Sequence, residues 1–218
     1  MKIFSTVLVS FAALLVMFNV TGCASARDAV EKEYQRLAST PVGAAVRCPE
    51  DRAIDNLGVA VNVNYAFAHK LMREYVSATE NHREYRGFLN DIKYYMDEEK
   101  LDEKAAAEKV RNAILAEDAK IADPKAKVWP RVVAGIKAAN GLKLEQKLKE
   151  IAVVVAANAK NLKTVGELKN SFKGFDAATV GKALLCVEIA SQAVFTAECL
   201  GFLTEQFRRT INAKIYEK

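Results

Sequence analysis

The sequence has few of the residues on which metal sites, disulfide frameworks and turn-rich folds depend. Its 218 residues include only 4 Cys, 4 Pro, 10 Gly and 2 His. So few cysteines exclude a disulfide-dense miniprotein, and so little glycine excludes a collagen-like fibre. A 51% share of hydrophobic residues excludes a largely disordered chain. Scarce proline and glycine, together with 35 alanines, favour long helices over a β architecture.

Sequence motifs of catalysis and cofactor binding are also missing. The chain contains no HExxH, GxSxG, CxxC, GxGxxG or P-loop pattern. Its two histidines, His69 and His82, are not preceded by Glu three positions earlier, as in the Glu-x-x-His pairs of di-iron bundles. We therefore expect no metal site, no cofactor and no enzymatic activity.

One long uncharged segment is present, and it lies at the N-terminus. Lys2 precedes an apolar run over residues 3–18 that carries no charge. A short apolar run that follows a basic residue and ends in small residues is typical of a secretory signal and not of a permanent membrane span. We expect residues 1–22 to be removed and residues 23–218 to form the mature helical domain.

The end of that segment, Val20-Thr21-Gly22-Cys23, resembles the lipobox of bacterial lipoproteins. The resemblance implies cleavage before Cys23 and attachment of acyl chains such as palmitate to this residue. Each buried methylene contributes about 0.8 kcal/mol, so two or three chains make a durable membrane anchor. In this family an aspartate after the cysteine commonly retains the protein in the inner membrane. Ala24 stands there instead, which implies the periplasmic side of the outer membrane in a Gram-negative source.

Charge is divided unevenly along the mature chain. Residues 24–123 hold 15 Lys+Arg and 19 Asp+Glu, a net charge of −4, whereas residues 124–218 hold 16 and 8, a net charge of +8. Two regions of opposite sign attract each other within one folded unit or present different faces to partners. Nucleic acid is not an expected partner of an exported protein.

Apolar residues recur at helical spacing along the mature chain. The pattern predicts helices over residues 25–39, 54–76, 85–96, 102–123, 128–140, 144–162, 165–172 and 176–218. Residues 58–67 also alternate between apolar and small or polar residues, as a strand would. The helical stripe there continues far beyond the length of a typical strand, so we favour a helix. We predict an all-α protein, a single bundle of about six to eight helices.

The last predicted helix is apolar on all sides as far as Leu203, and Arg208 and Arg209 follow. We expect other helices to surround its first half and its second half to lie on the surface. A membrane span over residues 183–203 is the alternative. Glu188 and Glu198 interrupt that stretch, and a charge at the centre of a span costs about 2.5–3.5 kcal/mol.

The helix predicted over residues 144–162 is amphipathic. Its expected buried stripe consists of Leu144, Leu148, Ile151, Ala152, Val155, Ala159 and Leu162. Five lysines are expected on the other side: Lys143, Lys147, Lys149, Lys160 and Lys163. They are candidate contacts to anionic lipid, to peptidoglycan carboxylates or to an acidic protein. Their even spread along the helix favours the alternative, an ordinary solvated face.

Three cysteines remain after Cys23, and exported proteins meet an oxidising compartment. Cys186 and Cys199 are 13 positions apart on one predicted helix, which is roughly 20 Å and too far for a disulfide. A disulfide would therefore join Cys48 to Cys186 or to Cys199. Three buried free thiols are an equally good expectation.

Together these features predict a membrane-anchored lipoprotein of the bacterial envelope with a structural or interaction role. One alternative is a periplasmic carrier or sensor of a small apolar ligand, bound between helices around residues 186–202, with Asn62, Asn64 or Glu188 pointing inward. Another is an envelope hydrolase of an unrecognised type, which needs His69 or His82 beside a carboxylate.

Overall fold

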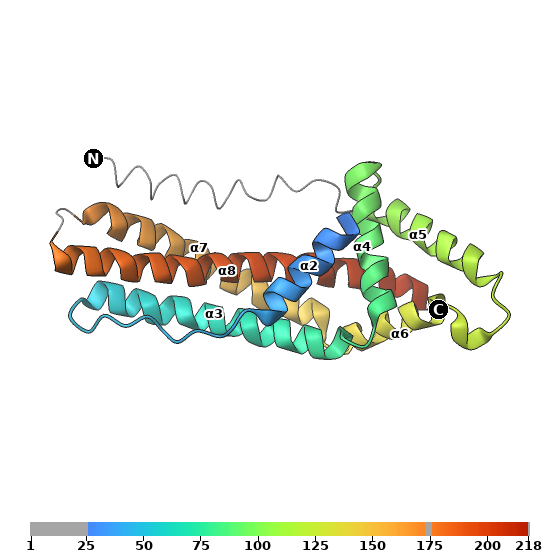
Figure 1. Ribbon diagram of the computed structural model, residues 1–218, viewed down its shortest axis with the longest axis horizontal. Coiled ribbons are helices and arrows are strands. Elements are labelled where there is room, and N and C mark those ends of the chain that lie inside the picture. The colour runs from blue at the N-terminus through green and yellow to red at the C-terminus, as the bar shows by residue number, and fades with distance from the viewer. Residues whose placement is uncertain (1–25, 173–175, 218) are drawn as a thin grey trace.

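The computed structural model describes residues 26–172 and 176–217, and the regular structure in these ranges is entirely helical. The elements are α2 (Ala26–Ser39), α3 (Arg52–Thr79), α4 (Arg83–Glu98), α5 (Glu103–Asp118), η2 (Pro124–Ala126), α6 (Trp129–Asn140), α7 (Leu144–Ser171), α8 (Ala177–Ala213) and η3 (Lys214–Glu217). The predicted all-α multi-helix bundle is confirmed (Figure 1).

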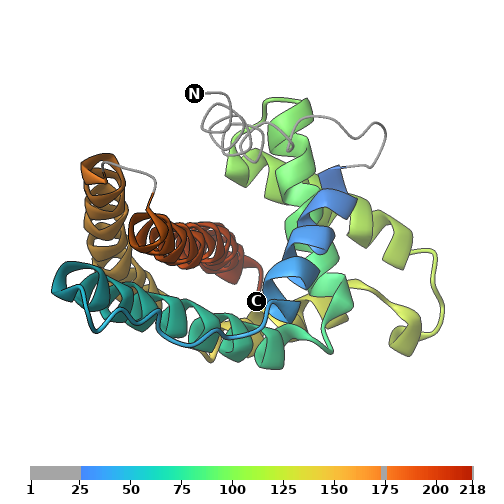
Figure 2. The ribbon, with the colours of Figure 1, turned by 60° about the vertical axis from the view of Figure 1, so that its left-hand side comes forward.

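Three long helices, α3, α7 and α8, form what we call the shaft. They lie side by side in both views, and α7 runs antiparallel to the other two (Figures 1 and 2). The shorter helices α4, α5 and α6 gather at the end of the shaft where α8 finishes, and α2 crosses over the shaft beside α4. The protein is therefore an elongated three-helix bundle with additional helices at one end.

Residues 58–67 belong to α3, so the preference for a helix over a strand is confirmed. Asp51 begins this helix because its carboxylate accepts hydrogen bonds from the backbone N–H groups of Ala53 and Ile54, at 3.1 and 3.3 Å. Such a cap satisfies donors that have no partner within the first turn. Seven large side chains of α3 are buried against its neighbours: Ile54, Leu57, Val61, Tyr65, Leu71, Met72 and Tyr75.

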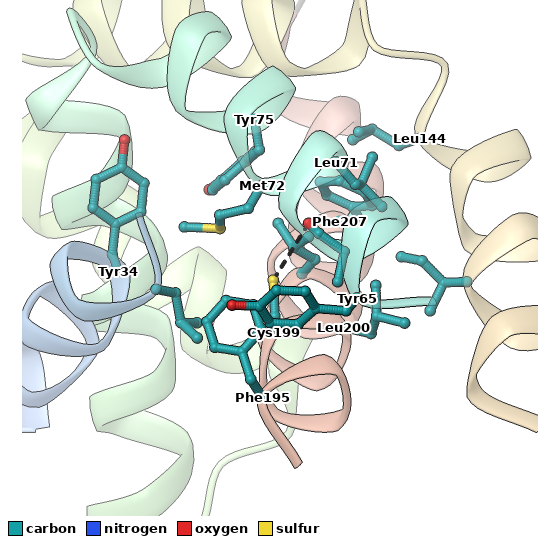
Figure 3. Close-up of a cluster of buried hydrophobic side chains, with 14 residues drawn as sticks. Tyr34, Tyr65, Leu71, Met72, Tyr75, Leu144, Phe195, Cys199, Leu200 and Phe207 are labelled. Atoms are coloured by element: carbon teal, nitrogen blue, oxygen red, sulfur yellow. Dashed lines mark hydrogen bonds between the residues drawn. The ribbon is translucent and has the colours of Figure 1, made fainter. Parts of the chain in front are cut away.

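A cluster of buried aromatic and aliphatic side chains joins α2 to the shaft (Figure 3). The ring of Tyr34 in α2 meets the ring of Tyr75 in α3 edge to face, with centroids 6.2 Å apart. Tyr75 in turn contacts Phe207 of α8, with centroids 5.7 Å apart. Each such pair contributes about 0.5–1.5 kcal/mol beyond the burial of its apolar area. These contacts fix α2 against both α3 and α8.

A segment without regular structure, residues 40–50, runs along α3. The hydroxyl of Tyr65 in α3 donates a hydrogen bond to the backbone oxygen of Pro41, at 2.8 Å. The side-chain amide of Gln192 in α8 donates to the backbone oxygen of Ala44, also at 2.8 Å. The segment is thus tied to two shaft helices at once.

α5 ends at Asp118, earlier than the Asp123 that we expected. The carboxylate of Asp118 accepts hydrogen bonds from the backbone N–H groups of Val128 and Trp129, at 2.8 and 2.7 Å. These two groups lie at the start of α6, where helix N–H groups have no partner within the helix. Asp118 therefore caps the following helix, and the chain leaves α5 at that residue.

α7 is one continuous helix of 28 residues, so the prediction of a separate short helix over residues 165–172 is wrong. Gly166 costs about 1 kcal/mol relative to alanine within a helix. The neighbouring Val165 is buried in a cluster with residues of α3 and α8, which favours continuation of the helix. The buried positions Leu144, Ile151, Asn158 and Val165 repeat every seven residues, as in a coiled coil. The predicted buried stripe was only partly right, because Ala152, Val155 and Ala159 are exposed.

The prediction for α8 is wrong for its second half, which is largely buried, and only partly right for its first half, where Cys186 and Ile189 are buried but other apolar side chains are exposed. In its first half Leu184 is 65% exposed and Val187 is 42% exposed, whereas in its second half Phe207 is fully buried and Arg209 is 3% exposed. The reason is the distribution of neighbours. Among the described elements, α3, α7 and the 40–50 segment accompany the first half, while α4, α5 and α6 also contact the second half.

One described stretch, Ala177–Tyr216, is long and apolar enough to cross a membrane. Half of its most apolar window is buried inside the bundle. Core helices of globular proteins have the same length and composition, so this feature alone is weak support for a span.

Candidate functional site

The predicted lipidation residue, Cys23, and the signal over residues 1–22 lie outside the described residues. The first described helix begins at Ala26, only three positions after Cys23. Its side chains Val30, Tyr34 and Leu37 are buried against the rest of the protein. The folded body therefore starts almost directly after the predicted attachment point.

All three remaining cysteines are free thiols, each at most 1% exposed. Cys48 and Cys186 belong to one buried cluster, which also contains Ile54 and Ile189, whereas Cys199 belongs to another. Of the two predicted disulfide pairings, only Cys48 with Cys186 joins residues of the same cluster. Burial raises the pKa of the Cys199 thiol to about 12, so this group is a weak nucleophile.

Beside Cys48, charged side chains link the start of α3 to the start of α8. Lys182 of α8 lies 2.8 Å from the carboxylate of Asp51, the residue that caps α3. This contact is the main reason why the pKa of Asp51 is lowered. Arg47 holds Asp55 at 2.7 Å in the same region. Each carboxylate here has a helix-capping or ion-pairing partner, and the arrangement is that of a structural junction.

His69 lies inside the shaft and not on a polar face. Its ring stacks on Phe195 with centroids 4.5 Å apart, and Tyr65 meets it edge to face at 4.4 Å. Burial, with a smaller contribution from the charge of Arg73, lowers the pKa of His69. His82 precedes the first residue of α4 and is half-buried. The neighbours of His69 give it a packing role, since a catalytic base would need a carboxylate or substrate proton within reach.

The five candidate lysines are distributed over several sides of α7 and its start. Lys147 lies 3.1 Å from Glu74 of α3, so it is part of the contact between these helices. Lys163 is 3.8 Å from Glu167, one turn away. Lys143, Lys149 and Lys160 are exposed. Contact with an anionic surface remains a prediction for the exposed members of this set, and Lys147 is already engaged within the fold.

The apolar groups on the surface of the shaft were missed by the sequence analysis. Seven large apolar side chains there are 40–71% exposed: Val59 and Val63 of α3, Val153 and Val155 of α7, and Val180, Leu184 and Val187 of α8. The signal was present in α7, where residues 151–159 contain no charge on any side of the helix. A helix that buries only one stripe must leave the others exposed unless a partner covers them.

A groove of about 390 Å³ lies between α4, α5 and the end of α8. Its apolar lining includes Ile92, Ala107, Ile215 and Tyr216, and Arg209 also borders it. Arg209 pairs with Glu205 at 2.8 Å. The predicted pocket around residues 186–202 does not coincide with this groove. Of the expected inward polar groups, Asn64 is buried, and Asn62 donates a hydrogen bond to a backbone oxygen of the 40–50 segment. Glu188 is exposed on α8, so its expected inward position is wrong.

Within residues 26–172 and 176–217, no group of three or more His, Cys, Asp or Glu side chains is arranged to hold a metal ion. Comparison of the chain with models of known protein families, with curated proteins and with solved structures gave no match. The structure thus defines a class, an all-helical bundle with a partly uncovered apolar shaft.

Proposed function

We propose that this protein is a lipid-anchored component of the bacterial envelope that acts through contacts with other molecules and not through catalysis. The observation that carries the proposal is the position of the fold relative to Cys23, because α2 begins three residues later, at Ala26. Three residues span at most about 10 Å, so the bundle stays beside the bilayer that holds the acyl chains. The periplasmic side of the outer membrane is favoured for a Gram-negative source.

Two surface features support a role in contacts. The shaft exposes seven large apolar side chains, and where such side chains form a contiguous patch they mark interaction sites in folded proteins. Lys149 and Lys160 add positive charge on the exposed sides of α7. Candidate partners are an envelope protein, anionic lipid or peptidoglycan.

The lipid anchor is tested with Cys23→Ala, expressed as the full chain in a Gram-negative host supplied with labelled palmitate. The wild-type chain should take up label, lose residues 1–22 and sediment with membranes. The variant should carry no label and keep its precursor mass. Cys186→Ala is the matched control, since this thiol is buried and its loss should leave labelling unchanged. Normal maturation and membrane retention of Cys23→Ala would contradict the proposal.

Carriage of a small apolar ligand is the second candidate, and the groove at the end of α8 favours it. Ile215 is 61% exposed and borders the groove, so Ile215→Lys changes its apolar lining without opening the core. A fluorescent apolar probe should bind the wild-type chain and bind this variant several-fold more weakly. Equal binding by both chains would remove the groove as a carrier site.

A further inference from the structure

One side of the shaft carries apolar and small residues at coiled-coil spacing on two neighbouring helices. On α7 they are Leu148, Ala152, Val155, Ala159, Leu162 and Gly166. On α8 they are Ala183, Val187, Ala190, Val194, Ala197 and Gly201. Within each set the spacing alternates between four and three residues, the pattern by which one helix packs against another. We call the two sets together the shaft face.

The two sets lie on the same side of the α7–α8 pair. Asn158 of α7 bonds to Ala193 of α8, which marks where these helices meet. Successive residues of an α-helix are about 100° apart around the helix axis. On this measure the centre of the α7 set lies about 80° from Asn158, and the centre of the α8 set lies about 80° from Ala193. Both rotations are in the direction of increasing residue number. Because α7 and α8 are antiparallel, equal rotations in the same sense point to one side of the pair. Lys147, which pairs with Glu74 of α3, lies about 20° from Asn158 in the opposite rotational sense, about 100° from the centre of the α7 set. The centre of the shaft face therefore points away from α3, whereas Ala190 is buried in a cluster with α3 residues and Leu148 and Leu162 pack against the core at its edges.

The shaft face has room for another helix. Val155 is 44% exposed and Val187 is 42% exposed. A side-chain carbon added at Gly166 or Gly201 would meet no atom within 4 Å. In Figure 2, α7 and α2 flank α8, and no described helix covers the side of α8 that points away from α3. The side of the α7–α8 pair that points away from α3 is thus open to further helices.

Charge favours a second copy of this chain as the occupant. α7 contains 5 Lys and 3 Glu, whereas residues 183–207 of α8 contain 3 Glu and no Lys or Arg. If a twofold axis runs parallel to the shaft, α7 of each copy lies on α8 of the other. Lys149 is as far before Asn158 as Phe202 is after Ala193, so it is level with a position between Glu198 and Glu205. Within its own chain Glu198 lies 2.7 Å from Arg36 and Glu205 lies 2.8 Å from Arg209, so Lys149 would be a second cation beside each carboxylate. The opposite arrangement, with α7 on α7, would bring lysines together.

The size of the shaft face fits a weak dimer. Each set extends over about 27 Å of helix, and two helices about 10 Å apart present a strip about 20 Å wide. Two such strips bury a total of about 1,100 Å², close to the lower limit of about 1,200 Å² for stable interfaces.

We propose that two copies of this chain pair through the shaft face, with α7 of each copy against α8 of the other, to form a four-helix bundle. The parallel twofold axis also places both α2 helices at the same height along the shaft. The proposal concerns the body of the protein and does not depend on the lipid anchor.

The test uses the full-length chain, co-expressed in cells as two differently tagged copies. One copy carries Val155→Cys and the other Ala197→Cys, because these positions are nearly level across the proposed interface. A membrane-permeant bismaleimide should give a product that carries both tags. In the control, Val153→Cys replaces Val155→Cys. Val153 is more exposed, at 71%, but it points away from the shaft face, so this pair should give at least tenfold less product.

Val155→Lys provides an independent measurement. Without cross-linker, Val155→Lys should reduce co-purification of the two tagged copies by at least about tenfold. A tenfold reduction corresponds to a loss of only about 1.4 kcal/mol of binding free energy at the interface. Val153→Lys should leave co-purification unchanged, and equal thermal melting of both variants shows that they fold. Lys149→Glu should weaken pairing several-fold. Three outcomes would overturn the proposal. The cross-linked products from positions 153 and 155 could be equal in amount, or the wild-type chain could be a monomer. Alternatively, the cysteine at position 155 could capture only lipid or another protein.

Discussion

The side-chain amide nitrogen of Asn158 donates a hydrogen bond of 2.8 Å to the backbone oxygen of Ala193, in the middle of the shaft. Asn158 is 2% exposed and occupies the same heptad position as Ile151 and Val165. Its side-chain oxygen has no hydrogen-bond partner in the described structure. A polar residue at such a position specifies the register of two helices at a cost in stability.

Asn158→Leu should therefore leave the free energy of unfolding within about 1 kcal/mol of the wild-type value, because one hydrogen bond is lost and an unpaired buried oxygen is removed. Asn158→Asp should lower it by about 3 kcal/mol or more, since a buried carboxylate without a partner costs more than a lost hydrogen bond. Urea unfolding measures both. If Asn158→Leu lowers the free energy of unfolding as much as Asn158→Asp does, the hydrogen bond of Asn158 contributes more than about 1 kcal/mol to stability.

Gly58 lies directly beneath the backbone oxygen of Val46, and a side-chain carbon there would overlap that oxygen. Gly58→Ala should lower the free energy of unfolding by about 2 kcal/mol, because the 40–50 segment must move away from α3. The matched control is Gly181→Ala in α8, where the added carbon meets nothing within 4 Å. That variant should be as stable as the wild type or up to about 1 kcal/mol more stable. If both substitutions change the free energy of unfolding equally, the 40–50 segment can move away from α3 at no measurable cost.

The buried imidazole of His69 makes stability depend on pH. Its pKa is lowered in the folded chain, chiefly by burial, so the unfolded chain binds a proton there more readily. The corresponding stabilisation is complete above the unfolded pKa of about 6.5 and is lost as pH falls through the folded value. Wild-type protein should be more stable at about pH 7.5 than at about pH 5.5, and His69→Phe should reduce this difference. His82→Gln is the control and should retain the difference in stability between the two pH values. A smaller difference in this variant would show that His69 is not its cause.

The three buried thiols should resist alkylation in the native protein. Burial raises the pKa of each cysteine, to about 12 for Cys199, and a thiol reacts through its thiolate. We expect maleimide to label none of Cys48, Cys186 and Cys199 until urea unfolds the chain, as counted by mass spectrometry. If oxidised protein yields a disulfide peptide, it should join Cys48 to Cys186. A bond from either of them to Cys199 would contradict the cluster assignment.

Features set by local chemistry were predicted well. Asp102 and Asp176 each accept hydrogen bonds from backbone N–H groups of the first turn that follows, and the helix starts expected there are confirmed. A cap depends only on a few neighbouring residues, so it can be recognised without the rest of the fold. The length of α7 was missed, because burial of Val165 by residues distant in sequence decides whether the helix continues past Gly166.

The sequence by itself determined that this protein is helical, where most helices begin, and which N-terminal motif precedes the body. Only the tertiary structure decided which apolar residues are buried. α8 is apolar on many sides, and its pattern does not show where its neighbours lie. α4, α5 and α6 contact the half that carries Arg209, whereas the other half buries Cys186 and Ile189 but leaves Leu184 exposed. Burial depends on where other helices are placed, and that placement results from contacts between residues far apart in the chain.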